Sequence, residues 1–96
     1  MPGASDIKDN TIFVGKKNTK SYVLAAITVL NQSAEKKLIV KARGKAISTA
    51  VDVVEMVRNK FFKDLSISDV KISTEELSNE DGSTVRVSAM EITLGK

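Results

Sequence analysis

The strongest constraint on the fold is a change of hydrophobic spacing that occurs twice along the first two thirds of the chain. Two short apolar runs, TIFVG (11–15) and KKLIVKARG (36–44), have the length and the β-branched content of buried strands. After each run, apolar side chains recur three or four positions apart, which predicts helices over about residues 19–32 and 45–61. Two strands joined by one helix pair most simply as a right-handed βαβ unit, so we expect them to be parallel.

The last third of the chain has the spacing of a β-hairpin. Residues 70–74 alternate between apolar and polar side chains, and residues 83–94 are rich in β-branched side chains. Asp81 and Gly82, between the two runs, form a common hairpin turn pair. The apolar phase changes within the second run, which predicts either a bulge near residues 88–90 or a strand that is covered on both faces.

The order of these elements is βαβαββ, without an internal repeat or a low-complexity tract. We therefore expect an α/β (α+β two-layer) fold, in which a four-stranded mixed sheet packs against two helices. A chain of 96 residues is the size of one domain, and its 42% apolar and 28% charged residues are typical of a globular protein. The prediction is a single domain over residues 10–96 that follows a flexible polar leader over residues 1–9.

The composition excludes many kinds of catalytic site. The chain has no cysteine and no histidine, which removes disulfides, thiolate nucleophiles, imidazole bases and the usual zinc ligands. VGKKN and RGKAIS both lack the first glycine of a phosphate-binding P-loop, and there is no GxGxxG pattern. We therefore expect no enzyme activity, no metal, no cofactor and no small-molecule substrate.

The hydrophobic segments are too short for a membrane protein. No apolar run approaches the roughly 18 residues that a bilayer crossing requires. The first ten residues, MPGASDIKDN, are polar and lack the apolar region of a secretory signal. We therefore expect a cytoplasmic location and no membrane partner.

The basic residues are concentrated in the first two thirds of the chain. Residues 1–63 contain twelve Lys and Arg against five Asp and Glu, a net charge of +7, whereas residues 64–96 contain three against seven, a net charge of −4. An excess of positive charge in one region favours an anionic partner, although surface lysines also serve solubility.

Parallel strands end at the same edge of a sheet, so the residues that follow the two predicted strands are brought together. Many of these residues are basic: Lys16, Lys17, Lys20, Lys41, Arg43 and Lys45. Alternation along the second strand places Lys41 and Arg43 on a common face. Both helices also begin at this edge, and the free N–H groups of a helix start attract anions. The residues alone leave two interpretations open, a phosphate-binding surface and an ordinary solvated edge of an α/β protein.

Phe61 and Phe62 are neighbours at the end of the second predicted helix. Consecutive helical residues point about 100° apart, so we expect one ring to complete the core but not both. The other ring is a candidate for an exposed contact with another protein.

Three stretches of the chain resemble the Alba family of small archaeal chromatin proteins. They are IFVGKKNTKSYVLAAITVLNQ, LIVKARGKAISTAVDVVEMVRNKF and DGSTVRVSAMEITLGK, and the likeness covers about residues 10–96. The resemblance implies a βαβαββ fold similar to the C-terminal domain of bacterial translation initiation factor three. It also implies a dimer that associates with the chromosome, binds double-stranded DNA and RNA with little sequence preference, and compacts or organises DNA.

The resemblance also carries nucleic-acid-binding positions onto this sequence. They correspond to the lysines of GKK, the basic residues of KARG and its neighbour, and one basic residue of the hairpin arm: Lys16, Lys17, Lys41, Arg43, Lys45 and Arg86. The resemblance marks Lys16 as a candidate site of reversible acetylation. It also implies that the hairpin arms reach along the minor groove of DNA.

The chain departs from the family pattern at several positions. Asn18 stands where a proline commonly follows the lysine pair, Thr49 replaces a common lysine, and Lys45 replaces the usual arginine. The hairpin carries four acidic residues where typical members have neutral or basic ones: Glu75, Glu76, Glu80 and Asp81. These charges repel phosphates, so we expect the arm to contribute less to binding than the family norm. Two alternative functions follow, a heterodimer or bridging partner of a more basic Alba chain and an RNA-binding subunit of a ribonucleoprotein.

Overall fold

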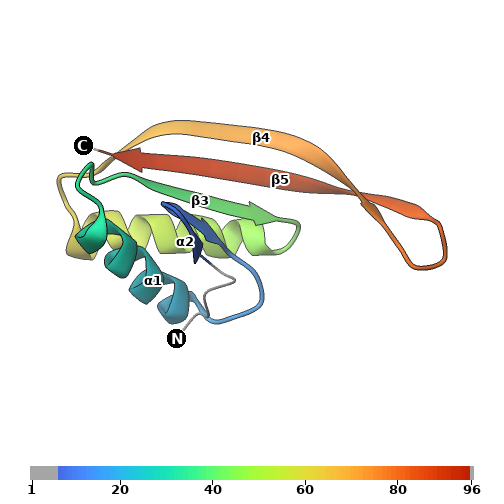
Figure 1. Cartoon of the computed structure of the whole chain (residues 1–96), viewed down its shortest axis with the longest axis horizontal. Coiled ribbons are helices and arrows are strands. Elements are labelled where there is room, and N and C mark those ends of the chain that lie inside the picture. Colours follow the sequence, from blue (N-terminus) through green and yellow to red (C-terminus); the bar gives the residue numbers. More distant parts are fainter. Residues whose placement is uncertain (1–6, 96) are drawn as a thin grey trace.

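Two helices and a mixed sheet form the two layers of the protein, in a computed structural model that describes residues 7–95 (Figure 1). In chain order the elements are β1 (Ile7–Lys8), β2 (Thr11–Phe13), α1 (Thr19–Gln32), β3 (Leu38–Arg43), α2 (Ala46–Met56), its π-helical extension η2 (Val57–Phe61), β4 (Ser66–Ser78) and β5 (Thr84–Gly95). The strand order in the sheet is β1-β2-β3-β5-β4. Both helices and four of the strands are those that the spacing predicts, so the expected fold class is confirmed.

β1 is a strand that the hydrophobic spacing does not predict. It contains only two residues and pairs antiparallel with β2 at one edge of the sheet. Both residues belong to the segment 1–9 that we expected to be a leader, and residues 1–6 of that segment lie outside the described part of the chain. β1 therefore extends the expected four-stranded sheet by one short edge strand.

β2 and β3 are parallel neighbours, with Ile12 opposite Val40, as the βαβ unit predicts. The helix between them, α1, is capped by Asn18, whose side-chain oxygen accepts a hydrogen bond from the backbone N–H of Ser21 at 3.0 Å. This cap satisfies one of the N–H groups that the start of a helix leaves unpaired. α1 can therefore begin directly after the short loop that leaves β2.

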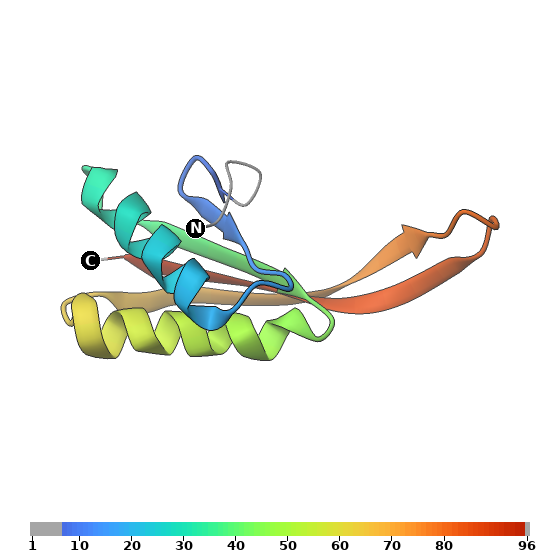
Figure 2. The same ribbon diagram turned by 90° about the horizontal axis from the view of Figure 1, so that it is seen from below.

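The core lies between the sheet and the two helices. Its largest fully buried side chains come from the strands, α1, α2 and η2: Ile12, Leu38, Val40, Leu94, Tyr22, Leu30, Val53, Val54 and Val57. Along β3, Val40 and Ala42 are buried, whereas Lys41 and Arg43 are exposed. Both helices cover the same face of the sheet (Figure 2). We call the opposite face, which carries Lys41 and Arg43, the open face.

β4 and β5 form a long antiparallel hairpin that extends beyond the helices (Figure 1). β3 pairs with β5 only as far as the pair Arg43 and Ala89, so in the described part of the chain no third strand lies beside residues 74–88. We call residues 74–88 the arm. At its tip, Asp81 accepts hydrogen bonds from the side chain and the backbone N–H of Ser83, which hold the pKa of Asp81 below its usual value. The arm therefore closes at the predicted Asp81-Gly82 turn.

The expected bulge near residues 88–90 is wrong. Strand pairing there is continuous, and the one register shift lies between Ile67 and Asp69 of β4. Ala89 is buried on the open face and Ile92 on the helix-covered face, but Glu91 and Thr93 on the open face are only partly buried, so the alternative prediction, a strand covered on both faces, does not hold for β5. The apolar phase changes because β5 leaves the helix-covered core here and enters the exposed arm.

The π-helical turn η2 separates the two neighbouring phenylalanines. The backbone N–H of Phe62 donates to the carbonyl of Val57 at 2.8 Å, which closes a wider turn than an α-helix would. Phe62 packs against the core, whereas 53% of Phe61 is exposed. The prediction that only one of the two rings joins the core is confirmed.

Replacing Asn18 by alanine removes the cap of α1. We expect Asn18→Ala to lower the free energy of unfolding by about 1 kcal/mol, measured by urea denaturation, because the N–H of Ser21 is left without its side-chain acceptor. Asn31→Ala, an exposed asparagine in the last turn of the same helix, is the matched control. Equal stability of the two variants would show that the cap contributes nothing.

Candidate nucleic-acid interface

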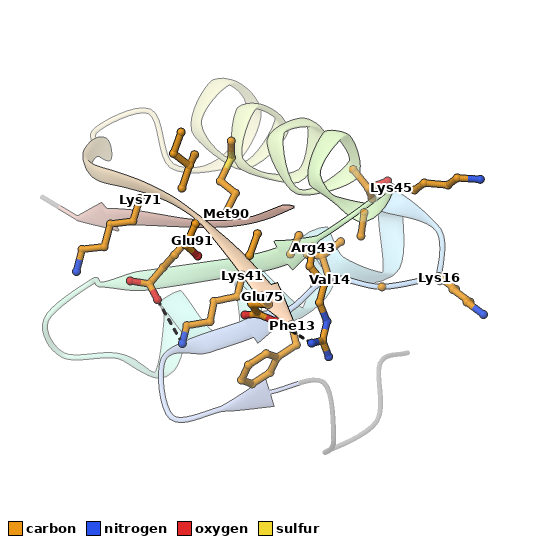
Figure 3. Close-up of a pocket in the computed structure, with 17 residues that line it drawn as sticks. Phe13, Val14, Lys16, Lys41, Arg43, Lys45, Lys71, Glu75, Met90 and Glu91 are labelled. Carbon is orange, nitrogen blue, oxygen red and sulfur yellow. Dashed lines mark hydrogen bonds and ion pairs between the residues drawn. The ribbon is translucent and has the colours of Figure 1, made fainter. Parts of the chain in front are cut away.

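The loops that follow β2 and β3 meet at one edge of the sheet. The parallel pairing continues past β2, because the backbone N–H of Val14 donates to the carbonyl of Lys41 at 2.8 Å. Lys16 then follows β2 within two residues of this bond, and Lys45 follows β3. The two basic loops therefore meet at this edge, as the sequence predicts (Figure 3).

Tyr22 attaches the first of these loops to α1. Its hydroxyl oxygen accepts hydrogen bonds from the backbone N–H of Gly15 at 2.9 Å and of Lys17 at 3.2 Å. The ring of Tyr22 is almost fully buried in the core. The backbone that carries Lys16 is thus held from both sides. The spacing identifies Tyr22 only as a member of the apolar stripe of the first helix. A buried tyrosine hydroxyl requires a hydrogen-bond partner, and in the structure this loop supplies it.

The second loop positions its cations by strand alternation and by a tight turn. Lys41 and Arg43 project from the open face, while Ala42 between them faces the helices. Gly44 has a φ of +58°, a conformation that glycine adopts without steric cost. This turn places Lys45 at the start of α2, where no side chain among residues 7–95 caps the helix. The first turn of α2 therefore keeps N–H groups that can bind an anion.

These side chains line one open groove of about 1170 Å³. Its five basic residues are Lys16, Lys41, Arg43, Lys45 and Lys71, against two acidic ones, Glu75 and Glu91. We call it the basic groove. It contains four of the seven positions that we predicted to bind nucleic acid, and Lys71, which we did not predict. Lys17, Lys20 and Arg86 do not line it.

Two cations of the groove are paired with carboxylates of the hairpin. A guanidinium nitrogen of Arg43 lies 2.8 Å from a carboxylate oxygen of Glu75, and the amine of Lys41 lies 3.2 Å from one of Glu91. The side chains of Arg43 and Glu75 are 56% and 47% exposed. Exposed ion pairs contribute only about 0.2 to 1 kcal/mol, so an incoming anion can displace these carboxylates at small cost.

Three further lysines at this edge are not paired in this way. Within residues 7–95, no carboxylate forms an ion pair with Lys16, Lys20 or Lys45, and all three are exposed. Lys16 and Lys45 extend from the same end of the groove (Figure 3). The uncompensated charge of the groove is therefore concentrated where the two loops meet.

Comparison with known proteins decides the family. The family model described as Alba matches residues 10–74. The chain belongs to the Alba family. It is 52% identical over 87 residues to the DNA/RNA-binding protein Alba of Methanocella arvoryzae, an alignment that covers 91% of this chain and 90% of that relative. A second DNA/RNA-binding protein Alba, from Thermoplasma acidophilum, is 52% identical over 93% of this chain and 98% of its own length. These names describe binding proteins and not enzymes.

Solved structures agree with this assignment. Alba from Thermoplasma volcanium superposes with a TM-score of 0.83 at 50% identity, over 91% of this chain and 100% of that chain. ALBA1 from Trypanosoma brucei has a TM-score of 0.73 at 24% identity, over 95% of this chain and 72% of that chain, and shares the fold. The two helices and the mixed sheet are thus the Alba fold.

The arm of this Alba chain is acidic in the structure as well as in the sequence. Arg86, its predicted nucleic-acid contact, lies opposite Glu76 in the strand register, and their side chains form an ion pair of 3.4 Å. Both side chains are exposed. Glu80 and Asp81 lie beyond them toward the tip. The charge of Arg86 is therefore compensated within the arm, at a distance from the basic groove.

The structure adds residues that the sequence did not indicate. Glu91 is the carboxylate beside Lys41, and Glu75 pairs with Arg43 although we expected it only to repel phosphates. Both partnerships depend on the register of β4, β5 and β3, which the spacing does not reveal.

No group of His, Cys, Asp or Glu within residues 7–95 could hold a metal ion. In the same range, no helix has the length and apolar character needed to cross a membrane.

Proposed function

We propose that this Alba chain binds double-stranded DNA and RNA, largely without sequence preference, through phosphate contacts in the basic groove. The observation that carries the proposal is that the loops of Lys16 and Lys45 meet beside Arg43 at one edge of the sheet, where neither lysine has a carboxylate partner among residues 7–95. The names of the Methanocella and Thermoplasma relatives support both kinds of nucleic acid.

Binding of this kind uses charge and not base identity. Lysine and arginine side chains neutralise phosphates and release the cations that surround the nucleic acid. Contacts to phosphates position a protein on the helix but carry no sequence information. Lys41 and Arg43 add to the contact once a phosphate displaces Glu91 and Glu75. Lys17 and Lys20, outside the groove, extend the positive surface along the first loop and the first turn of α1.

We propose a role in organising chromosomal DNA inside the cytoplasm, which requires one particle to contact more than one segment of duplex. A dimer provides two grooves for this purpose. Acetylation of Lys16, an exposed side chain at the loop edge of the groove, removes one positive charge and weakens binding. These roles follow from the groove and do not depend on the arm.

A second copy of an Alba chain is the proposed occupant of the apolar surface of β4. This edge strand exposes Ile67, Val70 and Ile72, the last at 76%. Their register partners in β5 include Ile92 and Leu94, which are buried beneath the helices, so the exposed side chains lie on the helix-covered side of the sheet. Edge strands with exposed apolar side chains tend to pair with another chain.

The acidic arm favours a second candidate function, as the partner of a more basic Alba chain. Glu76, Glu80 and Asp81 complement a positive surface better than a phosphate backbone. Phe61 is exposed at the end of η2 and is available for a protein contact. In this arrangement the chain bridges other subunits, and its own groove contributes less to the affinity.

An RNA-binding ribonucleoprotein subunit is a further alternative. Competition between duplex RNA and duplex DNA at matched salt distinguishes it.

A salt titration tests the phosphate contacts. A dimer that neutralises about six phosphates of duplex DNA has a log–log slope of affinity against salt near −5. We expect Lys16→Gln with Lys45→Gln to reduce the slope by about 0.9 for each phosphate that is no longer neutralised, and to weaken binding to all sequences alike. Lys37→Gln with Lys63→Gln, exposed lysines at the opposite end of the sheet, is the control. An unchanged slope in the groove variant would reject the proposal.

Removing the groove carboxylates tests their competition with phosphate. We expect Glu75→Gln with Glu91→Gln to increase the affinity for duplex DNA by roughly 2- to 10-fold, because Arg43 and Lys41 no longer need to leave an ion pair. The control is Glu35→Gln with Glu80→Gln, which changes the net charge equally but leaves both pairs in place. Equal increases in the two variants would attribute the effect to net charge alone. Fluorescence anisotropy at fixed salt measures both.

Light scattering tests the association through β4. We expect wild-type protein to have twice the mass of the 10.4 kDa chain, and Ile72→Asp to have the mass of one chain, because a buried carboxylate opposes the contact. Val85→Asp, on the exposed arm, is the control and remains dimeric. In a mixture with a more basic Alba chain, a protein that stays a homodimer excludes the bridging function. A dimeric Ile72→Asp variant would place the interface elsewhere.

A further inference from the structure

Phe13 is an aromatic side chain in an unusual position. Its neighbours in the chain, Ile12 and Val14, are buried beneath the helices, whereas 41% of Phe13 is exposed. It is the register partner of Lys41, so it projects from the same open face. Phenylalanine normally gains stability from burial, and an exposed ring on a strand forgoes part of that gain.

The ring lies beside two cations. Phe13 lines the basic groove together with Lys41 and Arg43, and Figure 3 shows its ring near the charged ends of both side chains. The strand register continues this row across the open face, from Phe13 to Lys41 of β3, Glu91 of β5 and Lys71 of β4. The groove as a whole contains five basic residues against two acidic ones. The groove therefore combines an aromatic ring with a net positive charge, although the two cations beside the ring are paired with Glu75 and Glu91 until an anion displaces these carboxylates.

This combination matches the chemistry of an unpaired nucleotide. Proteins bind single-stranded nucleic acid by stacking bases on exposed aromatic rings while cations hold the adjacent phosphates. An intact duplex offers such a ring no free base face away from its ends, because both faces of each base are stacked within the helix and inserting a side chain requires unstacking a base step. The ring is thus redundant for the phosphate contacts proposed above, which need only the lysines and the arginine.

We propose that the open face of the sheet binds single-stranded nucleic acid, with one unpaired base stacked on Phe13 and the adjacent phosphates on Arg43 and Lys41. This inference rests on the proposed function, because it uses the same groove and the same cations. It adds a base contact that is made by stacking alone, so it accepts any base. It adds binding of loops, ends and melted segments to the duplex binding proposed above.

The competing occupant of the ring is an apolar side chain of a partner protein. A protein contact would be satisfied by any apolar residue at this position, whereas stacking requires an aromatic ring. Phe13→Leu keeps the apolar character and removes the ring. Phe61→Leu makes the same change at another exposed phenylalanine, at the end of η2, and is the matched control.

The experiment measures binding of the full chain to a short single-stranded oligonucleotide that contains 2-aminopurine, in RNA and DNA forms, and to a duplex of the same length. Stacking on an aromatic ring changes the fluorescence of 2-aminopurine. We expect Phe13→Leu to weaken single-strand binding by roughly 5- to 150-fold and to abolish the fluorescence change, while duplex binding stays within about twofold. Phe61→Leu should behave as the wild type. Comparing the RNA and DNA forms identifies which strand is preferred.

Phe13→Trp provides a second readout that does not depend on loss of function. The chain contains no tryptophan, so the emission of this variant reports on position 13 alone. We expect single strands to quench it and duplexes of equal length to leave it unchanged. Unquenched emission with a bound single strand, or equal single-strand affinity of Phe13→Leu and wild type, would overturn the stacking proposal while salt-dependent duplex binding survives. Absence of any salt-dependent binding by the wild type would instead overturn the proposed function.

Discussion

The parallel pairing of β2 and β3 is the interaction on which the rest of the interface depends. It brings the ends of two strands to one edge, and the bond from Val14 to the carbonyl of Lys41 extends this pairing to the start of the first basic loop. Tyr22 then ties the same loop to α1 by two hydrogen bonds. Because the loop is held by the sheet and by a core residue, the loops that carry Lys16 and Lys45 stay at one edge despite the repulsion between their positive charges.

The open face of the sheet carries positive side chains paired with negative ones and is not uniformly positive. β5 and β4 bring Glu91 and Glu75 to Lys41 and Arg43, and the arm pairs Arg86 with Glu76. Because these pairs are exposed or, at Glu91, half-buried at the surface, each stabilises the fold only weakly. The same carboxylates oppose phosphates at every cation they contact. The chain thus keeps its strongest attraction for anions at the loop edge and reduces it along the hairpin.

The sequence predicted those parts of this structure that depend on local spacing. Both helices, the parallel strands, the Asp81-Gly82 turn and the common face of Lys41 and Arg43 follow from periods of 3.6 and 2 and from turn residues. The ion pairs could not be predicted, because the partner of each cation is set by the register between β3, β5 and β4. The bulge expected near residues 88–90 was wrong for a related reason, since a change of apolar phase along one strand does not show whether the pairing shifts or the strand leaves the core.

Local spacing correctly predicts that Phe13 lies on a strand, but it does not show that its ring lies on an uncovered face of the sheet. In TIFVG three consecutive apolar side chains predict a buried strand, yet only Ile12 and Val14 are buried, whereas Phe13 between them is exposed. A large apolar ring on an uncovered face conflicts with stability, and such conflicts are expected at functional positions. Lys41 and Arg43 serve both proposed contacts, a duplex backbone and the phosphates beside a stacked base. One groove therefore cannot hold duplex and single strand at the same time, so the form of nucleic acid that occupies Arg43 excludes the other.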